Sequence, residues 1–156
     1  MNTRLTLDFR TLLLLMTLSW AALAENQAPP TRHVIVFARQ NLEIEVELAT
    51  SQAQRETGLM HRTHLGETQG MLFVYPATEE LRVWMKNTLL PLDVLFLDND
   101  GRIVALLENL QPCRQHSCPI FTSKKPARYM LELNAGFIAR QHLALGQSVQ
   151  LPAATP

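Results

Sequence analysis

The sequence lacks an excess of charge of either sign. Its 156 residues include 14 basic and 14 acidic side chains, so the formal net charge is zero. Proteins that bind nucleic acid through its backbone neutralise phosphates with lysine and arginine. We therefore expect no nucleic-acid partner, and recognition of any partner has to depend on shape.

The sequence also lacks an apolar run long enough for a membrane-spanning helix. The run 11–23, interrupted by hydroxyl side chains, falls short of the roughly 20 apolar residues that cross a bilayer. It follows Arg4 and Arg10 and ends in Ala22-Leu23-Ala24, the order of regions in a secretory signal peptide. We expect cleavage after Ala24 and a periplasmic or secreted protein that contacts the membrane only through the signal peptide. A retained anchor is the alternative.

Removal of residues 1–24 takes away Arg4, Arg10 and Asp8 and leaves 12 basic and 13 acidic side chains, a formal charge of −1. The polar segment 25–32, which contains Pro29-Pro30, is expected to be a linker. A chain of this length buries one core rather than two. We therefore expect a single domain over residues 33–152, followed by a tail at 153–156.

Short apolar or alternating runs predict strands at 33–38, 42–48, 70–75, 81–85, 92–97, 102–107, 128–133 and 147–151. Pro76 is expected to end one of them, and Asp98-Asn99-Asp100-Gly101 is expected to form a hairpin turn.

Two short helices are predicted, at 51–57 and 136–142. Ser51 and Gln54 have the spacing of a capping box, and Gly58 marks the end of the first helix. About six to eight short strands with two short helices are typical of a mostly β (α+β) domain. Because short strands have to protect their edges, we expect a small compact barrel-like domain, with an open sheet and two packed helices as the alternative.

Several segments together resemble a known family. They are Glu47-Leu48-Ala49, 55–60, Gly70-Met71-Leu72-Phe73, Trp84-Met85-Lys86-Asn87-Thr88, Pro91-Leu92-Asp93, Phe96-Leu97-Asp98, Gly101, Pro112-Cys113, 126–133 and Ala135-Gly136. The pattern resembles the domain of unknown function 192 over roughly residues 42–151. The resemblance implies a compact, β-rich and often exported domain, and it brings no activity, substrate or cofactor with it.

Trp84, Lys86, Asn87 and Asp93 are the candidate ligand-binding residues. An aromatic face beside hydrogen-bonding groups commonly holds sugars or cations, and strand alternation places Trp84 and Lys86 on one side. Lys86 and Asp93 are expected to approach each other across a turn, where they would orient a ligand or, with Lys86 desolvated, supply a base. A structural ion pair and a core tryptophan are the competing interpretations.

Cys113 and Cys118 are the only cysteines, and both follow the signal peptide. In an oxidising compartment they are expected to form a disulfide. The alternative is a copper or zinc site made by Cys113, His116 and Cys118. We otherwise expect no metal and no cofactor, and we expect the methionines to fill the core.

The sequence contains neither a Gly-x-Ser-x-Gly nucleophile motif nor a glycine-rich phosphate loop. No catalytic residue is therefore assigned, which favours a non-enzymatic binding or accessory module of the cell envelope. Its partner would be a small polar ligand or another envelope protein. A soft-metal-binding protein, and an enzyme that acts on an envelope component with Lys86 or Asp93, are the alternatives.

Overall fold

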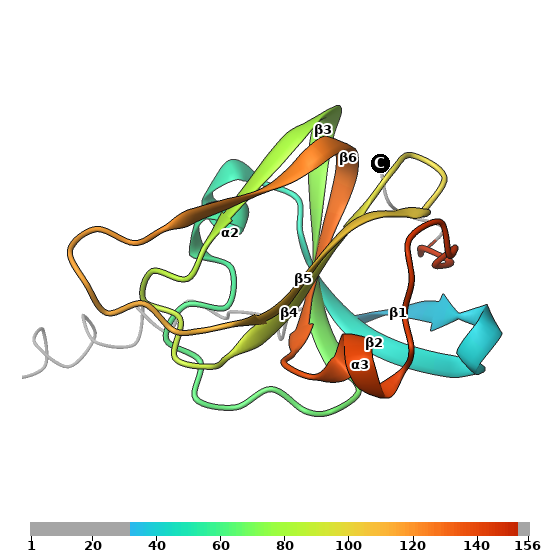
Figure 1. Cartoon of the computed structure of the whole chain (residues 1–156), viewed down its shortest axis with the longest axis horizontal. Coiled ribbons are helices and arrows are strands. Elements are labelled where there is room, and N and C mark those ends of the chain that lie inside the picture. Colours follow the sequence, from blue (N-terminus) through green and yellow to red (C-terminus); the bar gives the residue numbers. More distant parts are fainter. Residues whose placement is uncertain (1–31, 153–156) are drawn as a thin grey trace, which may run out of the picture. The chain divides into compact units, whose positions relative to one another are not determined.

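The computed structural model describes residues 32–152, which form a six-stranded sheet with short helices (Figure 1). The expected signal peptide 1–24, the tail 153–156 and all of the expected linker except Arg32 lie outside these residues. The mostly β (α+β) fold class is confirmed. Within residues 32–152, no helix is long and apolar enough to cross a membrane.

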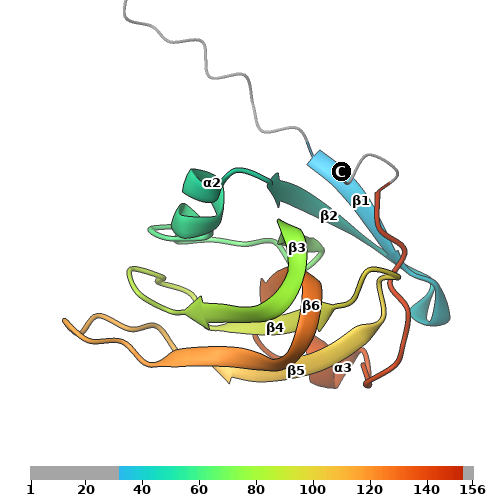
Figure 2. The same cartoon turned by 90° about the horizontal axis from the view of Figure 1, so that it is seen from above.

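The strands are β1 (Arg32–Phe37), β2 (Leu42–Ala49), β3 (Gln69–Trp84), β4 (Leu92–Leu97), β5 (Ile103–Leu110) and β6 (Ile120–Asn134). They are ordered β1-β2-β3-β6-β4-β5 across the sheet, with β2 and β3 parallel and all other neighbours antiparallel. The helices are the 3-10 helix η1 (Ala38–Gln40), α2 (Gln52–Thr57) and α3 (Phe137–Arg140). Figure 2 shows the long strands β3 and β6 curving together.

Both faces of the sheet are buried. The first core packs α3 onto one face and includes Ile35, Ile44, Leu72, Leu95, Leu131 and Phe137. The second core includes Leu59, Phe73, Met85, Val94, Phe96 and Met130. Strand β6 supplies alternate residues to the two cores, because successive side chains of a strand point to opposite faces. Three methionines, Met71, Met85 and Met130, fill the second core as expected.

Helix α2 forms where the capping box predicts it. The Gln54 backbone N–H donates to Ser51 Oγ at 3.2 Å, and the Ser51 backbone N–H donates to Gln54 Oε1 at 2.9 Å. Gly58 ends the helix with a φ of 47°. A Cβ atom at Gly58 would come within 3.0 Å of the Phe73 ring, so glycine also lets the helix end pack closely on the second core.

The prediction that Pro76 ends a strand is wrong, because β3 continues through Pro76 to Trp84. The register with β6 shifts between Val74 and Glu79, and Pro76 pairs with no residue there. A proline has no N–H to donate, and a bulge is one of the places in a sheet that tolerates it. Strand β6 also begins at Ile120, earlier than expected, because residues 120–122 pair with the end of β3.

The sheet is not closed into a barrel by strand pairing, since β1 and β5 are its outer strands. The segment predicted as a strand at 147–151 makes isolated bridges instead, from Gln150 to Val36 and from Ser148 to Arg102. The Gln150 N–H donates to the Val36 carbonyl at 2.9 Å. The domain is therefore barrel-like only in the loose sense that one segment joins its two outer strands.

Candidate functional site

Trp84 and Lys86 lie together where β3 ends. The Lys86 ammonium sits 5.4 Å from the centroid of the Trp84 ring, and 43% of Trp84 is exposed. Asn87 follows in a left-handed conformation, and its carbonyl accepts a hydrogen bond of 2.9 Å from the His61 backbone N–H. Asn87 therefore ties the loop after α2 to the end of β3.

Asp93 lies apart from this group and is held by backbone hydrogen bonds. Its side chain is fully buried, with Oδ1 accepting from the Asn109 backbone N–H and Oδ2 from the Ile138 backbone N–H, both at 2.8 Å. Within residues 32–152, no ion pair joins Lys86 to Asp93. The Asp93 carboxylate thus fastens the end of β5 and the first turn of α3 to β4.

The structure points to a residue that sequence reasoning missed, Glu132. It lies in the middle of β6, paired with Met71 of β3 and Val94 of β4, and only 5% of it is exposed. Within the described residues its carboxyl has no hydrogen-bond or ion-pair partner, and its oxygens are not among the fully enclosed side-chain atoms that lack one, so they face the pocket described below. Burial raises the pKa of Glu132 from 4.5 to about 8, so the group is largely protonated at neutral pH.

The available sequence signal was the position of Glu132 within the apolar run Tyr129 to Leu133. Apolar residues at consecutive positions, without alternation, indicate a strand that is covered on both faces. A carboxyl within such a strand is therefore expected to be buried. A buried polar group without a partner is rare in folded proteins and calls for an explanation.

A small pocket with a volume of about 60 Å³ lies over Glu132. Its apolar walls come from the second core, and its polar groups from α2, β3 and the turn after β3. The lining residues used below are Arg55, Tyr75, Arg82, Val83, Trp84 and Glu132. Trp84 is thus the one member of the predicted group that lines this pocket.

Arg55 and Tyr75 hold one wall of the pocket in place. Arg55 Nη1 donates to the carbonyls of Thr50 and Val74, and its guanidinium lies 5.1 Å from the centroid of the Tyr75 ring. Burial raises the pKa of Tyr75 above its ordinary value of 10, partly offset by the Arg55 charge. Tyr75 therefore presents a neutral hydroxyl near Glu132.

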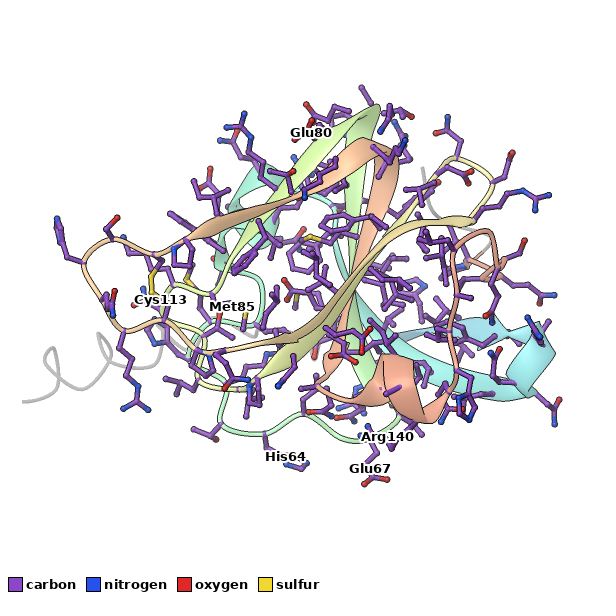
Figure 3. The ribbon with its side chains drawn as sticks, in the orientation of Figure 1. His64, Glu67, Glu80, Met85, Cys113 and Arg140 are labelled. Atoms are coloured by element: carbon purple, nitrogen blue, oxygen red, sulfur yellow. A yellow bond between two sulfur atoms is a disulfide. The ribbon has the colours of Figure 1, made fainter. Side chains whose placement is uncertain are left out.

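An ion pair supports the loop that follows α2. Arg62 binds Glu47 of β2 with two hydrogen bonds of 2.6 and 2.5 Å. The hydrogen bond with Arg62 is the main reason that the pKa of Glu47 is lowered. His64 and Glu67, farther along this loop, point outward and are exposed (Figure 3).

Cys113 and Cys118 form the expected disulfide. Figure 3 shows Cys113 beside Met85, whose carbonyl accepts the Cys113 backbone N–H at 3.0 Å. Disulfide sulfurs are not thiolates, so the alternative soft-metal site with His116 lacks its two sulfur ligands in this structure. Elsewhere in residues 32–152, no group of three or more His, Cys, Asp or Glu residues is placed to hold a metal.

Solved structures that are similar to this chain include the following two. A protein from Sinorhizobium meliloti 1021, described as a candidate transcription regulator, is 41% identical with a TM-score of 0.69; the match covers 76% of this chain and 91% of that one. A protein of unknown function from Novosphingobium aromaticivorans DSM 12444 is 28% identical with a TM-score of 0.73, covering 80% and 89%. No curated protein matches the chain.

The model of the DUF192 family, described as "Uncharacterized ACR, COG1430", matches residues 34–151. This range contains every strand from β2 to β6, the disulfide and the Glu132 pocket. The chain belongs to the DUF192 family.

Proposed function

We propose that the domain is an exported, non-enzymatic binding module of the cell envelope, and that the pocket over Glu132 holds a small polar ligand. The observation that carries this proposal is a buried carboxyl without a protein partner at the wall of a pocket. Folding would favour an apolar residue there, since burial disfavours the ionised form of this carboxyl and raises its pKa. A ligand that hydrogen bonds to Glu132 explains why a carboxyl occupies the site.

Binding is favoured over nucleophilic catalysis by the composition of the pocket. Among the described residues that line it, there is no serine, cysteine, histidine or lysine. Both carboxylate oxygens of Asp93 accept hydrogen bonds from backbone N–H groups, and Asp93 does not line the pocket. Ordered aromatic and guanidinium groups around one buried carboxyl are the kind of lining that orients a ligand.

The disulfide supports the exported location, since such bonds persist in oxidising compartments. An intact-mass measurement on protein from its native compartment tests this part. We expect a mass that lacks residues 1–24 and a deficit of two hydrogens that reductant restores. A full-length mass with free thiols would contradict export.

The description of the relative from Sinorhizobium meliloti raises the question of DNA binding. This chain has 14 basic and 14 acidic side chains, a balance that gives little non-specific attraction to phosphates. We therefore propose a small ligand, and not nucleic acid, as its partner.

Methyl NMR on protein labelled at the methionine methyl groups tests the pocket directly, because Met60 and Met130 line it. A mixed set of organic acids, amines, sugars and amino acids is the probe. We expect at least one class to shift both methyl signals, and Val83→Phe, which fills the pocket, to abolish the shifts. Val34→Phe makes the same change at an exposed position and should bind normally. Shifts that persist in Val83→Phe, or no shift with any class, would contradict the proposal.

A further inference from the structure

The surroundings of Glu132 indicate the chemical class of the ligand, an inference that rests on the proposed function. Two shallow depressions adjoin the pocket, and Arg55 and Tyr75 line all three. Arg82 and Trp84 are shared between the pocket and one of these depressions. The three hollows share Arg55 and Tyr75 and are together called the groove below, and among them only the pocket is lined by Glu132.

The groove, with Lys86 beside it, carries more positive than negative charge. Arg55 and Arg82 are cationic side chains of its lining, and Glu56 and Glu79 are exposed acidic side chains of the same lining. Lys86, above the Trp84 ring, adds a further positive charge beside it. Since Glu132 is largely protonated at neutral pH, it does not offset this excess. An anion is therefore attracted to the groove, and a cation is repelled.

The pocket lined by Glu132 is small. An engineered apolar cavity of about 150 Å³ holds benzene, which has six heavy atoms. On that scale a volume of about 60 Å³ holds two or three heavy atoms, the size of a carboxylate group and too small for a sugar ring. The remainder of a ligand would lie in the open groove, beside Tyr75 and Trp84.

We infer that the pocket binds the carboxylate of a small organic acid, which accepts a hydrogen bond from the Glu132 carboxyl and is balanced by Arg55 and Arg82. A hydrogen bond to an ionised acceptor is about twice as strong as one between neutral groups. Arginine adds planar donors that fit a carboxylate. The arrangement discriminates against amines, because an ammonium group would be repelled by the two guanidinium groups of the lining.

Binding of a carboxylate requires the protonated form of Glu132, so it depends on pH. The other charged or titratable groups around the site are Arg55 and Glu56 on α2, Tyr75, Glu79 and Arg82 on β3, Lys86 after β3, and the Glu47–Arg62 pair beside Met71. Burial raises the pKa of Tyr75, which favours its neutral form. With Glu132 titrating at about 8, the apparent Kd is expected to weaken about 30-fold from pH 6 to 9.5.

The test is a methyl NMR titration with propionate and with propylammonium, at about pH 6 and about pH 9.5. Propionate is expected to shift the Met60 and Met130 signals at the lower pH and to bind about 30-fold more weakly at the higher one. The Met85 methyl, which is buried outside the pocket lining, serves as the internal control.

Variants separate the role of Glu132 from the role of Arg82 in binding the carboxylate. Glu132→Gln keeps a donor that does not titrate, so it should bind propionate at both pH values with a similar Kd. Arg82→Ala should weaken propionate binding about 10-fold, by loss of one charge-assisted contact. Arg102→Ala removes an exposed arginine outside the groove and should leave the Kd unchanged.

Two outcomes would overturn the inference. If propylammonium binds better as the pH rises and Glu132→Gln abolishes this binding, the ligand is a cation and the proposed binding function still stands. If propionate shifts neither methyl signal at either pH, the carboxylate class is wrong. Failure of the proposed function is a separate result, namely that no class in the mixed set shifts these signals or that the shifts survive in Val83→Phe.

Discussion

Glutamine in place of Glu132 is expected to stabilise the protein at neutral and alkaline pH, with little effect at acid pH. Burial raises the pKa of this carboxyl from 4.5 to about 8 in the folded protein, and the unfolded chain keeps the ordinary value. Below pH 4.5 the carboxyl is protonated in both states. As the pH rises toward 8, only the unfolded state gains by releasing the proton, so the free energy of unfolding falls across this window and levels off above it.

The size of the effect follows from the shift. Each pKa unit is worth about 1.4 kcal/mol, so the change from 4.5 to about 8 lowers the free energy of unfolding by about 5 kcal/mol over the whole window. Because only 5% of Glu132 is exposed, water screens little of this cost. The glutamine side chain does not titrate, so the free energy of unfolding of this variant does not fall with pH for this reason.

Denaturant unfolding of wild type, Glu132→Gln and Glu56→Gln at about pH 4, 6.5 and 9 measures the difference. The stability gap between Glu132→Gln and wild type should open steadily from the first pH to the last. Glu56→Gln removes an exposed glutamate of the same groove and should follow the wild-type profile. Parallel profiles of wild type and Glu132→Gln would refute the reasoning, since they would mean that the buried carboxyl ionises like one in water.

Three further substitutions test the surrounding framework by the same unfolding assay. Asp93→Asn keeps one acceptor and leaves one backbone N–H without a partner, so it should lower the free energy of unfolding by about 2–3 kcal/mol. Lys86→Ala should lower it by less than about 1 kcal/mol. A strong coupling energy in the double mutant would instead support a Lys86–Asp93 ion pair. Reduction of Cys113–Cys118 should lower stability by about 2 kcal/mol because the closed loop is short, and loss of folding on reduction would contradict this. Ser51→Ala removes one side of the capping box and should cost about 1 kcal/mol, and an unchanged midpoint would show that α2 is held by its packing alone.

Local signals in the sequence predicted much of the fold. The helix after Ser51 and the strand Leu92–Leu97 occur where their residues predict them, because a capping box and a mostly apolar run each depend on neighbouring residues. The predicted strand end at Pro76 was wrong because a proline is a strong local signal for a strand end. The bulge that accommodates Pro76 depends on the partner strand β6. Such long-range compensation leaves no trace near the proline itself.

The site was only partly predictable for the same reason. Trp84 and Lys86 are close in the chain, and their contact could be anticipated from strand alternation. The partners of Asp93 are the backbone groups of Asn109 and Ile138, distant in sequence and without a side-chain signature. The apolar neighbours of Glu132 signal its burial, but its place over a pocket depends on β6 lying inside the sheet between β3 and β4.

The bridges of residues 147–150 also bear on how the protein folds and stays soluble. These residues follow all six strands in the sequence, yet they bond to the end of β1 and to the start of β5. Until this segment is in place, both outer strands keep unpaired N–H and C=O groups, which are templates for aggregation. Loss of these few residues would therefore expose two distant surfaces at once, and a truncated chain should aggregate more than its small loss of buried area suggests.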